Sequence, residues 1–159
     1  MLKKYKQLAL AMELLNRQAR ATIVQQVTGL PIKLIRKTYK ELHGRSSGRG
    51  SLKFSTRGVT SSNLRFKEVT LFAVCFRAFD DKRLESHAHR VIAAFDIYKQ
   101  SNPAGQLNFS EAWVIAQDLR DKTIQITKCP HCKSWVLLNA REDLSERCGV
   151  CKANMELNW

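Results

Sequence analysis

Residues 129–151 contain Cys129-Pro-His-Cys132, fifteen further residues and then Cys148-Gly-Val-Cys151. Two CxxC pairs at this separation are typical of a four-thiolate zinc site. The two-residue gap lets one tight turn direct two sulfurs at the same ion, and the second pair completes a tetrahedron. Because four protein thiolates leave no coordination position for water or substrate, we expect one structural Zn²⁺ held by all four cysteines.

Short β-prone segments surround these cysteines, namely Thr123–Thr127, Trp135–Leu138 and Met155–Trp159. Aromatic and β-branched residues favour strands. Short strands beside two CxxC turns predict a small zinc ribbon over residues 123–159.

Three alternatives to zinc remain for the same cysteines. Two disulfides would need an oxidising compartment, but the sequence shows no apolar signal peptide. A redox CxxC normally accompanies a βαβ pattern, which the surrounding sequence lacks. The third alternative is chance spacing. A Cys3His site that uses His131 is a variant of the zinc hypothesis, and Cys75 lies in an apolar run typical of a buried thiol.

The composition indicates a globular protein of one ordinary domain or two small ones. The chain has 159 residues, 44% of them hydrophobic, with only 7 Gly and 3 Pro. No run approaches the roughly 18 apolar residues that a membrane span requires. We therefore expect no membrane association and a cytoplasmic location.

The net charge of +13 is concentrated in the first third of the chain. Residues 1–60 contain 13 Lys and Arg against two acidic residues, whereas residues 61–159 contain 14 basic and 12 acidic residues. A local excess of this kind favours a surface that meets nucleic acid over a merely soluble basic surface. An anionic membrane would require a basic helix with exposed aromatic or leucine side chains, and residues 1–60 hold one Phe and no Trp.

The basic region predicts three helices. The first spans 3–18, with Leu8, Ala11, Met12 and Leu15 on one face. The second spans about 19–27, and the third runs from Pro31 to His43 and ends at Gly44. Helices two and three, joined by a short turn, resemble a helix-turn-helix.

The third helix has two distinct faces at roughly 100° per residue. Four cations share one arc: Lys33, Arg36, Lys37 and Lys40. Four apolar residues share another: Ile32, Ile35, Tyr39 and Leu42. This pattern suits a recognition helix in a major groove, although an ordinary surface helix with a solvated lysine face carries it too.

Other basic residues extend the predicted DNA-binding set. Arg45, Arg49 and Lys53 lie in or just after the flexible loop 44–50. Four more flank the CxxC pairs: Lys128, Lys133, Arg147 and Lys152. These four either offset the charge of −2 on a four-thiolate Zn²⁺ site or contact phosphate, and the two roles are compatible.

Three further helices should form a central core that also serves a partner subunit. Ser62 or Asn63 caps the first, the second spans about 85–100, and the third starts at Ser110 with Glu111. The expected fold class is therefore mainly α. It comprises a helix-turn-helix-like region and linker over 1–60, a helical core over 61–122 and the zinc ribbon over 123–159.

With these features in view, the chain resembles the FlhC family, the C subunit of the bacterial flagellar master transcriptional regulator. The matching stretches are collinear: Gln7–Leu14, Ala19-Arg20, Thr28-Gly-Leu30, Tyr39-Lys-Glu-Leu42 with Gly44, Gly50-Ser-Leu-Lys-Phe-Ser-Thr56, Ala112-Trp113 and the four cysteines.

The resemblance implies a mainly helical transcription activator subunit that binds zinc through these cysteines and is not an enzyme. It implies a hetero-oligomer with an FlhD-type partner, binding to double-stranded promoter DNA in the nucleoid, and recruitment of RNA polymerase, with no small-molecule substrate. The loop Arg45–Arg49 lacks the family's Pro-Pro-Lys run, and the chain stops eight residues past Cys151. Flagellar operons and conjugative-transfer operons of a plasmid or integrative element therefore both remain possible targets.

Two other functions compete with this one. An RNA-binding zinc-ribbon protein of the translation apparatus would also combine a ribbon with a basic arm, but it usually needs exposed aromatics. A zinc deaminase requires a His-x-Glu motif and an open metal position. His87-Ala-His89 has no Glu, which argues against that enzyme.

Overall fold

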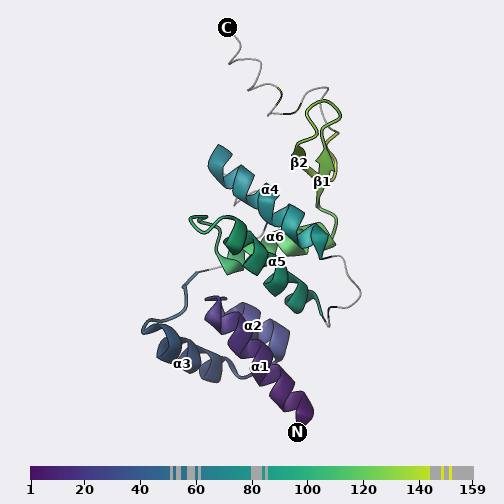
Figure 1. Cartoon of the computed structure of the whole chain (residues 1–159). Coiled ribbons are helices and arrows are strands. Elements are labelled where there is room, and N and C mark those ends of the chain that lie inside the picture. Colours follow the sequence, from purple (N-terminus) through teal and green to yellow (C-terminus); the bar gives the residue numbers. More distant parts are fainter. Residues whose placement is uncertain are drawn as a thin grey trace.

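The computed structural model describes residues 1–50, 52, 55–56, 60, 62–79, 84, 86–143, 148 and 151. Within these residues the protein is mainly helical, as the sequence predicts, with one small antiparallel sheet (Figure 1). The elements are α1 (Leu2–Asn16), α2 (Ala21–Thr28), α3 (Ile32–His43), α4 (Asn63–Ala78), α5 (His87–Ser101), α6 (Phe109–Arg120), β1 (Ile124–Lys128) and β2 (Trp135–Asn139).

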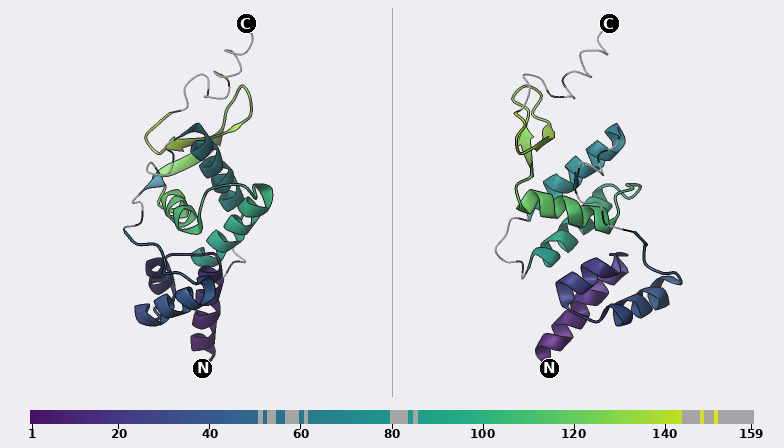
Figure 2. Two further views of the ribbon diagram at one scale, coloured as in Figure 1. Left: turned by 90° about the vertical axis from the view of Figure 1, so that its left-hand side faces the viewer. Right: turned by 180° about the vertical axis from the view of Figure 1, so that it is seen from behind.

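The elements follow one another along the molecule in three groups. Figures 1 and 2 show α1–α3 at one end, α4–α6 in the middle and the β1–β2 hairpin beyond them. Helix α4 contacts α5, α6 and both strands, so it links the helical middle to the hairpin. None of the helices in the described part of the chain has the length and apolar character that a membrane span requires.

The helix ends follow local chemistry. Gly29 and Gly44 adopt left-handed φ values of 70° and 65° and terminate α2 and α3. Ser62 caps α4 by accepting a hydrogen bond from the backbone N–H of Arg65. The predicted start of α6 at Ser110 is confirmed to within one residue, since the helix begins at Phe109; Asn108 is the cap and forms a capping box with Glu111.

Helix α1 buries a different stripe from the predicted one. Ala11 and Leu15 are buried as expected, but Leu8 and Met12 are each 40% exposed. Leu14, at 0% exposure, completes the buried stripe instead. Relative to the prediction, the helix is therefore rotated about its axis so that Leu14 faces the core, and Leu8 and Met12 lie at the edge of the contact.

The middle helices pack around aromatic side chains. Phe72 and Tyr98 are fully buried in edge-to-face contact, and Phe95 meets Phe109 in the same way at 5.2 Å between ring centroids. Most aromatic residues of this region therefore belong to the core, although Phe66 is 37% exposed.

Charged side chains join the groups of helices. Arg17, which follows α1, donates two hydrogen bonds to Asp96 of α5, at 2.8 and 2.6 Å. Within the middle group, Arg65 lies between Glu68 and Glu111, at 3.0 and 2.6 Å, and all three side chains are largely buried. These pairs fix how α1 lies against α5 and how α4 lies against α6.

The hairpin has the register Ile124↔Asn139 through Lys128↔Trp135. The strands predicted at 123–127 and 135–138 are confirmed to within one residue at each end. The third β-prone stretch, Met155–Trp159, lies outside the described residues.

Candidate nucleic-acid interface and metal centre

The four cysteines predicted to bind metal converge at the end of the hairpin. Their sulfur atoms all lie within 4.8 Å of one another. The Sγ–Sγ distance is 3.6 Å from Cys129 to Cys151, 3.4 Å from Cys132 to Cys148 and 3.7 Å from Cys148 to Cys151. Four sulfurs placed tetrahedrally at about 2.3 Å from one Zn²⁺ would be about 3.8 Å apart, whereas a disulfide requires about 2.05 Å. The cluster therefore has the dimensions of a metal site.

The hairpin positions the first pair of cysteines. Strand β1 ends at Lys128 and β2 begins at Trp135, so the first CxxC forms the connecting turn. The backbone N–H of Cys129 donates to Ser134 at 2.9 Å, and that of Lys133 donates to Cys129 at 3.0 Å. Lys133 adopts a left-handed φ of 60°, which closes the turn.

The thiols differ in their affinity for protons. The backbone N–H of Cys132, with other backbone donors, lowers the pKa of Cys129 to about 6. The neighbouring thiol of Cys132, together with desolvation, raises the pKa of Cys151 to about 12. Four thiolates cannot share so small a volume without a cation, and a metal ion supplies that charge by displacing the protons.

Neither His131 nor Cys75 belongs to this cluster. His131 is exposed, and the described group of mutually close ligands contains the four cysteines alone. Cys75 is buried within α4, and that burial raises the pKa of its thiol.

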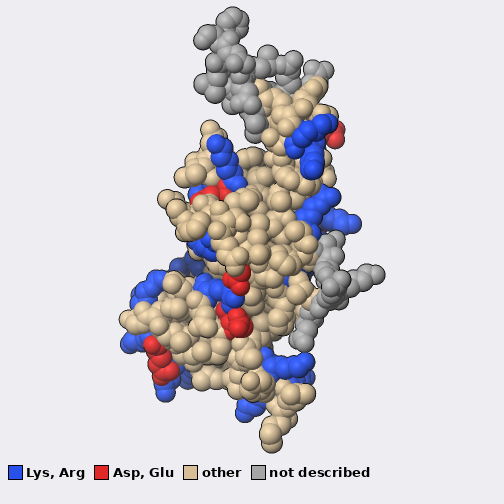
Figure 3. Space-filling view, viewed as in Figure 1, with Lys and Arg blue, Asp and Glu red and all other residues tan. Residues whose placement is uncertain are grey.

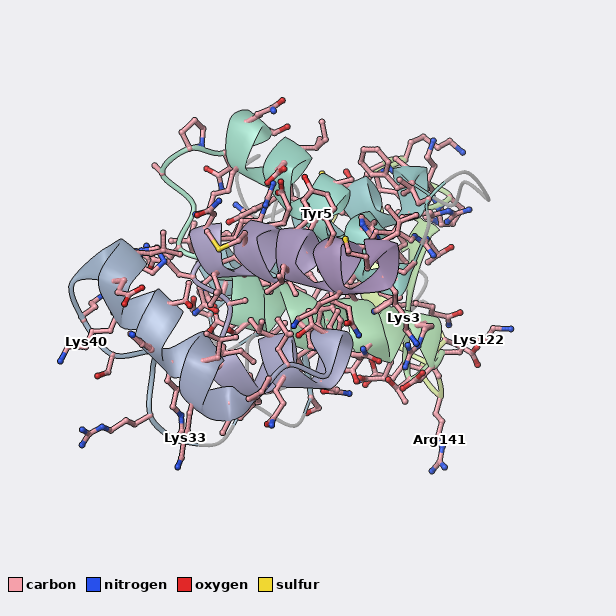
Figure 4. The ribbon with its side chains drawn as sticks, turned by 90° about the horizontal axis from the view of Figure 1, so that it is seen from below. Lys3, Tyr5, Lys33, Lys40, Lys122 and Arg141 are labelled. Atoms are coloured by element: carbon pink, nitrogen blue, oxygen red, sulfur yellow. The ribbon has the colours of Figure 1, made fainter. Side chains whose placement is uncertain are left out.

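The basic face of α3, formed by Lys33, Arg36, Lys37 and Lys40, is exposed. Lys33 and Lys40 extend together away from the helical body in Figure 4, and basic side chains gather over α3 in Figure 3. Lys37 approaches Glu41 at 3.9 Å, an exposed pair of little energetic weight. The face presents long cationic donors toward solvent.

The opposite side of α3 packs on α1 and α2 as predicted, except at Leu42. Ile35 and Tyr39 are buried and Ile32 is half-buried, but Leu42 is 41% exposed. His43 takes the inward position instead, because its Nε2 lies 2.8 Å from the carbonyl oxygen of Leu15 and its ring packs on Tyr39. A three-residue turn joins α2 to α3, as in helix-turn-helix proteins.

The loop after α3 folds back toward α2. Arg45 donates to the side-chain oxygen of Gln18 at 2.6 Å. Arg49 lines a cavity together with Arg36 and Arg20. Arg20 was not among the predicted site residues, although it belongs to the Ala19-Arg20 stretch that matches the family pattern.

The basic residues near the cysteines have local contacts of their own. Lys128 lies over the ring of Trp135 at 5.0 Å, and Arg77 makes the same kind of contact with this ring at 5.1 Å. Lys133 donates to the carbonyl oxygen of Pro130 at 2.7 Å. The remaining predicted contacts lie outside the described residues: Lys53, Arg147 and Lys152.

Comparison with known proteins identifies relatives over almost the whole chain. The model of the family described as flagellar transcriptional activator (FlhC) matches residues 1–156. The flagellar transcriptional regulator FlhC of Cupriavidus necator is 27% identical over 158 residues, which cover 95% of this chain and 76% of that protein. The proteins of the same name from Serratia marcescens and Nitrosomonas eutropha are 26% and 24% identical, each covering 92% of this chain and 78% of the relative.

Proposed function

The chain belongs to the FlhC family of flagellar transcriptional activators, and we propose that it is the DNA-binding subunit of a transcription activator. Proteins of this family are regulators and not enzymes. The proposed targets are promoters of flagellar or conjugative-transfer operons, reached in the cytoplasm at the nucleoid.

The observation that carries the proposal is the exposed basic face of α3. Lys33, Arg36, Lys37 and Lys40 point away from the packed side of the helix, where Ile35 and Tyr39 are 1% and 2% exposed. Long cationic donors on one helical face suit phosphate oxygens and the O6 and N7 atoms of guanine. Arg45, Arg49 and Lys53 would extend this surface along a phosphate backbone.

The metal centre supports the proposal by fixing the far end of the chain. One structural Zn²⁺ bound by Cys129, Cys132, Cys148 and Cys151 would hold the ribbon folded, since the binding free energy of so small a site is folding free energy. Lys128 and Lys133 would then carry their charge at fixed positions beside the ribbon, together with Arg147 and Lys152.

An FlhD-type partner and RNA polymerase complete the proposed assembly. The resemblance that implies them extends over most of the chain, and the family match spans residues 1–156. We propose the middle helices as the partner-binding region.

The test is purification of the zinc-loaded chain with a co-expressed FlhD-type partner, followed by footprinting on genomic DNA. We expect protection of discrete sites upstream of operons. Added duplex DNA should compete this protection away, whereas an equal mass of RNA should not. Protection abolished equally by RNA would support the RNA-binding alternative and contradict the proposal.

A further inference from the structure

A cavity of about 420 Å³ lies where the loop after α3 returns over the start of α2. Three arginines from three separate segments line it: Arg20 just before α2, Arg36 on α3 and Arg49 in the loop. The other lining residues include Ser46, Ser47 and Gly48, and none carries a carboxylate. We call this cavity, with its three arginines, the arginine cup.

The three arginines line the same cavity, and no described residue of its lining carries a negative charge. In the part of the chain that the structure describes, Arg20 makes one hydrogen bond to another lining residue, from Nη1 to the carbonyl oxygen of Gly50 at 2.8 Å. Arg36 and Arg49 form no ion pair with a described residue. By contrast, Arg17 and Arg65 each bind two carboxylates. Like charges brought together in this way repel, and a bound anion removes that repulsion.

The donors of the cup match a phosphoryl group. Each arginine offers a planar fork of N–H groups that fits phosphate oxygens. The N-cap of α2 is Arg20 itself, which gives that helix no side-chain cap, so the first amides of α2 add donors beside the arginines. The volume lies within the ~300–1,000 Å³ of small-ligand sites and leaves room for the sugars that adjoin a phosphodiester.

The position of Arg36 favours the DNA backbone as the source of the phosphate. On the wheel of α3, Arg36 is the basic residue nearest the buried stripe, roughly 60° from Tyr39, so it belongs both to the cup and to the basic face. Lys33 and Lys40, which extend from that face in Figure 4, continue the same charged surface.

We propose that the arginine cup is a socket for one phosphate of the DNA backbone, which sets the register of α3 on the duplex. This proposal rests on the proposed function and adds Arg20 as an anchoring residue. A phosphate site formed by several segments of the protein fixes the position of the protein on the duplex and carries no information about the base sequence.

The first test uses the full-length zinc-loaded chain without DNA and inorganic pyrophosphate as the probe. Backbone amide shifts of Ala21, Thr22 and Gly48, followed by NMR, should titrate to saturation. Arg20→Gln should weaken this binding by about tenfold or more, because one charged donor is lost. Lys67→Gln is the matched control, since it removes one exposed charge from α4, and it should leave binding unchanged.

Two further variants separate binding from folding. Arg49 has no hydrogen bond or ion pair to a described residue, so Arg49→Gln should leave the unfolding midpoint unchanged and still weaken pyrophosphate binding. Arg20→Lys keeps the charge but loses the planar guanidinium group, and should weaken pyrophosphate binding too. An absence of saturable shifts at these amides, or shifts that survive both glutamine variants, overturns the proposal.

The second arm identifies the source of the phosphate. A short duplex at low salt should displace pyrophosphate from the same amides, and Arg20→Gln should reduce the salt slope of duplex binding by about one unit relative to Lys67→Gln. Duplex binding without displacement, or preference for a nucleoside diphosphate over duplex, overturns the DNA socket and leaves the proposed function intact. A chain that binds no duplex even with its partner contradicts the proposed function itself.

Discussion

Asp118 of α6 accepts both the backbone N–H and the hydroxyl of Thr56 at one carboxylate oxygen, and each distance is 2.7 Å. Thr56 is only 2% exposed, although it lies in the connection between α3 and α4. This pair attaches the connection between α3 and α4 to the middle helices. It also gives a physical reason for the presence of Thr56 in the family resemblance.

The Asp118 pair predicts a stability change. Thr56→Val keeps the shape of the side chain but leaves the half-buried carboxylate of Asp118 with one donor fewer, which should cost about 1–3 kcal/mol of unfolding free energy in chemical denaturation. Thr70→Val removes an exposed hydroxyl that bonds within its own helix, and should change stability by less than about 0.5 kcal/mol. Equal effects of the two substitutions would contradict this role for Asp118.

The buried arginine network predicts a larger effect. Glu68 is 4% exposed and accepts hydrogen bonds from Arg65 and from the backbone N–H of Gln106. Arg65→Met removes the cation that binds the buried carboxylate of Glu68, so it should lower the unfolding free energy by about 3–5 kcal/mol. Glu41→Ala, which breaks the exposed pair with Lys37, should cost less than about 0.5 kcal/mol in the same denaturant titration. A small effect of Arg65→Met would show that this network is not a major source of stability.

The environment of His87 predicts a pH dependence of stability. Its ring lies between Phe76 and Trp113, at 5.8 and 5.3 Å, and burial lowers its pKa from 6.5 to about 4. Between pH 6.5 and pH 4 the unfolded chain binds a proton there that the folded chain does not, so this contribution to stability falls as the pH falls. His87→Phe should flatten the stability profile in that window, measured by thermal unfolding at a series of pH values.

The control for His87 is His89, which lies near it on α5 and bonds to Ser86 through Nδ1. His89→Gln should leave the slope between pH 6.5 and pH 4 as in the wild type. Retention of the full slope in His87→Phe would assign the pH dependence to another group.

The metal centre predicts a stoichiometry. The purified chain should contain one zinc, and Cys148→Ser should lower that content and loosen the β1–β2 hairpin, seen by NMR, while the helical circular dichroism persists. Cys75→Ser removes a buried thiol outside the cluster and should retain one zinc. A metal-free wild-type protein with two disulfides would contradict the zinc assignment.

Much of the architecture could be predicted from the sequence because its determinants are local. Gly44 ends α3 since glycine tolerates the left-handed conformation, and Ser62 caps α4 through its hydroxyl. The cysteine spacing predicted the cluster because two CxxC turns close on one point. The rotation of α1 could not be predicted, because Leu8 and Leu14 are equally apolar and only packing against neighbouring helices selects between them.

Contacts between segments that are distant in the chain could not be predicted from the sequence either. Arg65 meets Glu111 across 46 positions, and either residue alone resembles an ordinary surface charge. The arginine cup likewise assembles Arg20, Arg36 and Arg49 only after the loop has folded back over α2. Such sites depend on tertiary structure, which local periodicity does not encode.

Duplex DNA binding by the zinc-loaded chain and its partner, measured across a salt series, tests directly whether α3 lies on DNA. We expect affinity to fall steeply with salt, and Lys33→Ala with Lys40→Ala to make the log–log slope shallower by about two units. Lys67→Ala with Lys122→Asn removes the same number of charges elsewhere and should preserve the slope. A slope that is identical in both double variants, or a wild-type complex that does not bind duplex DNA, would show that α3 is not the DNA-binding surface.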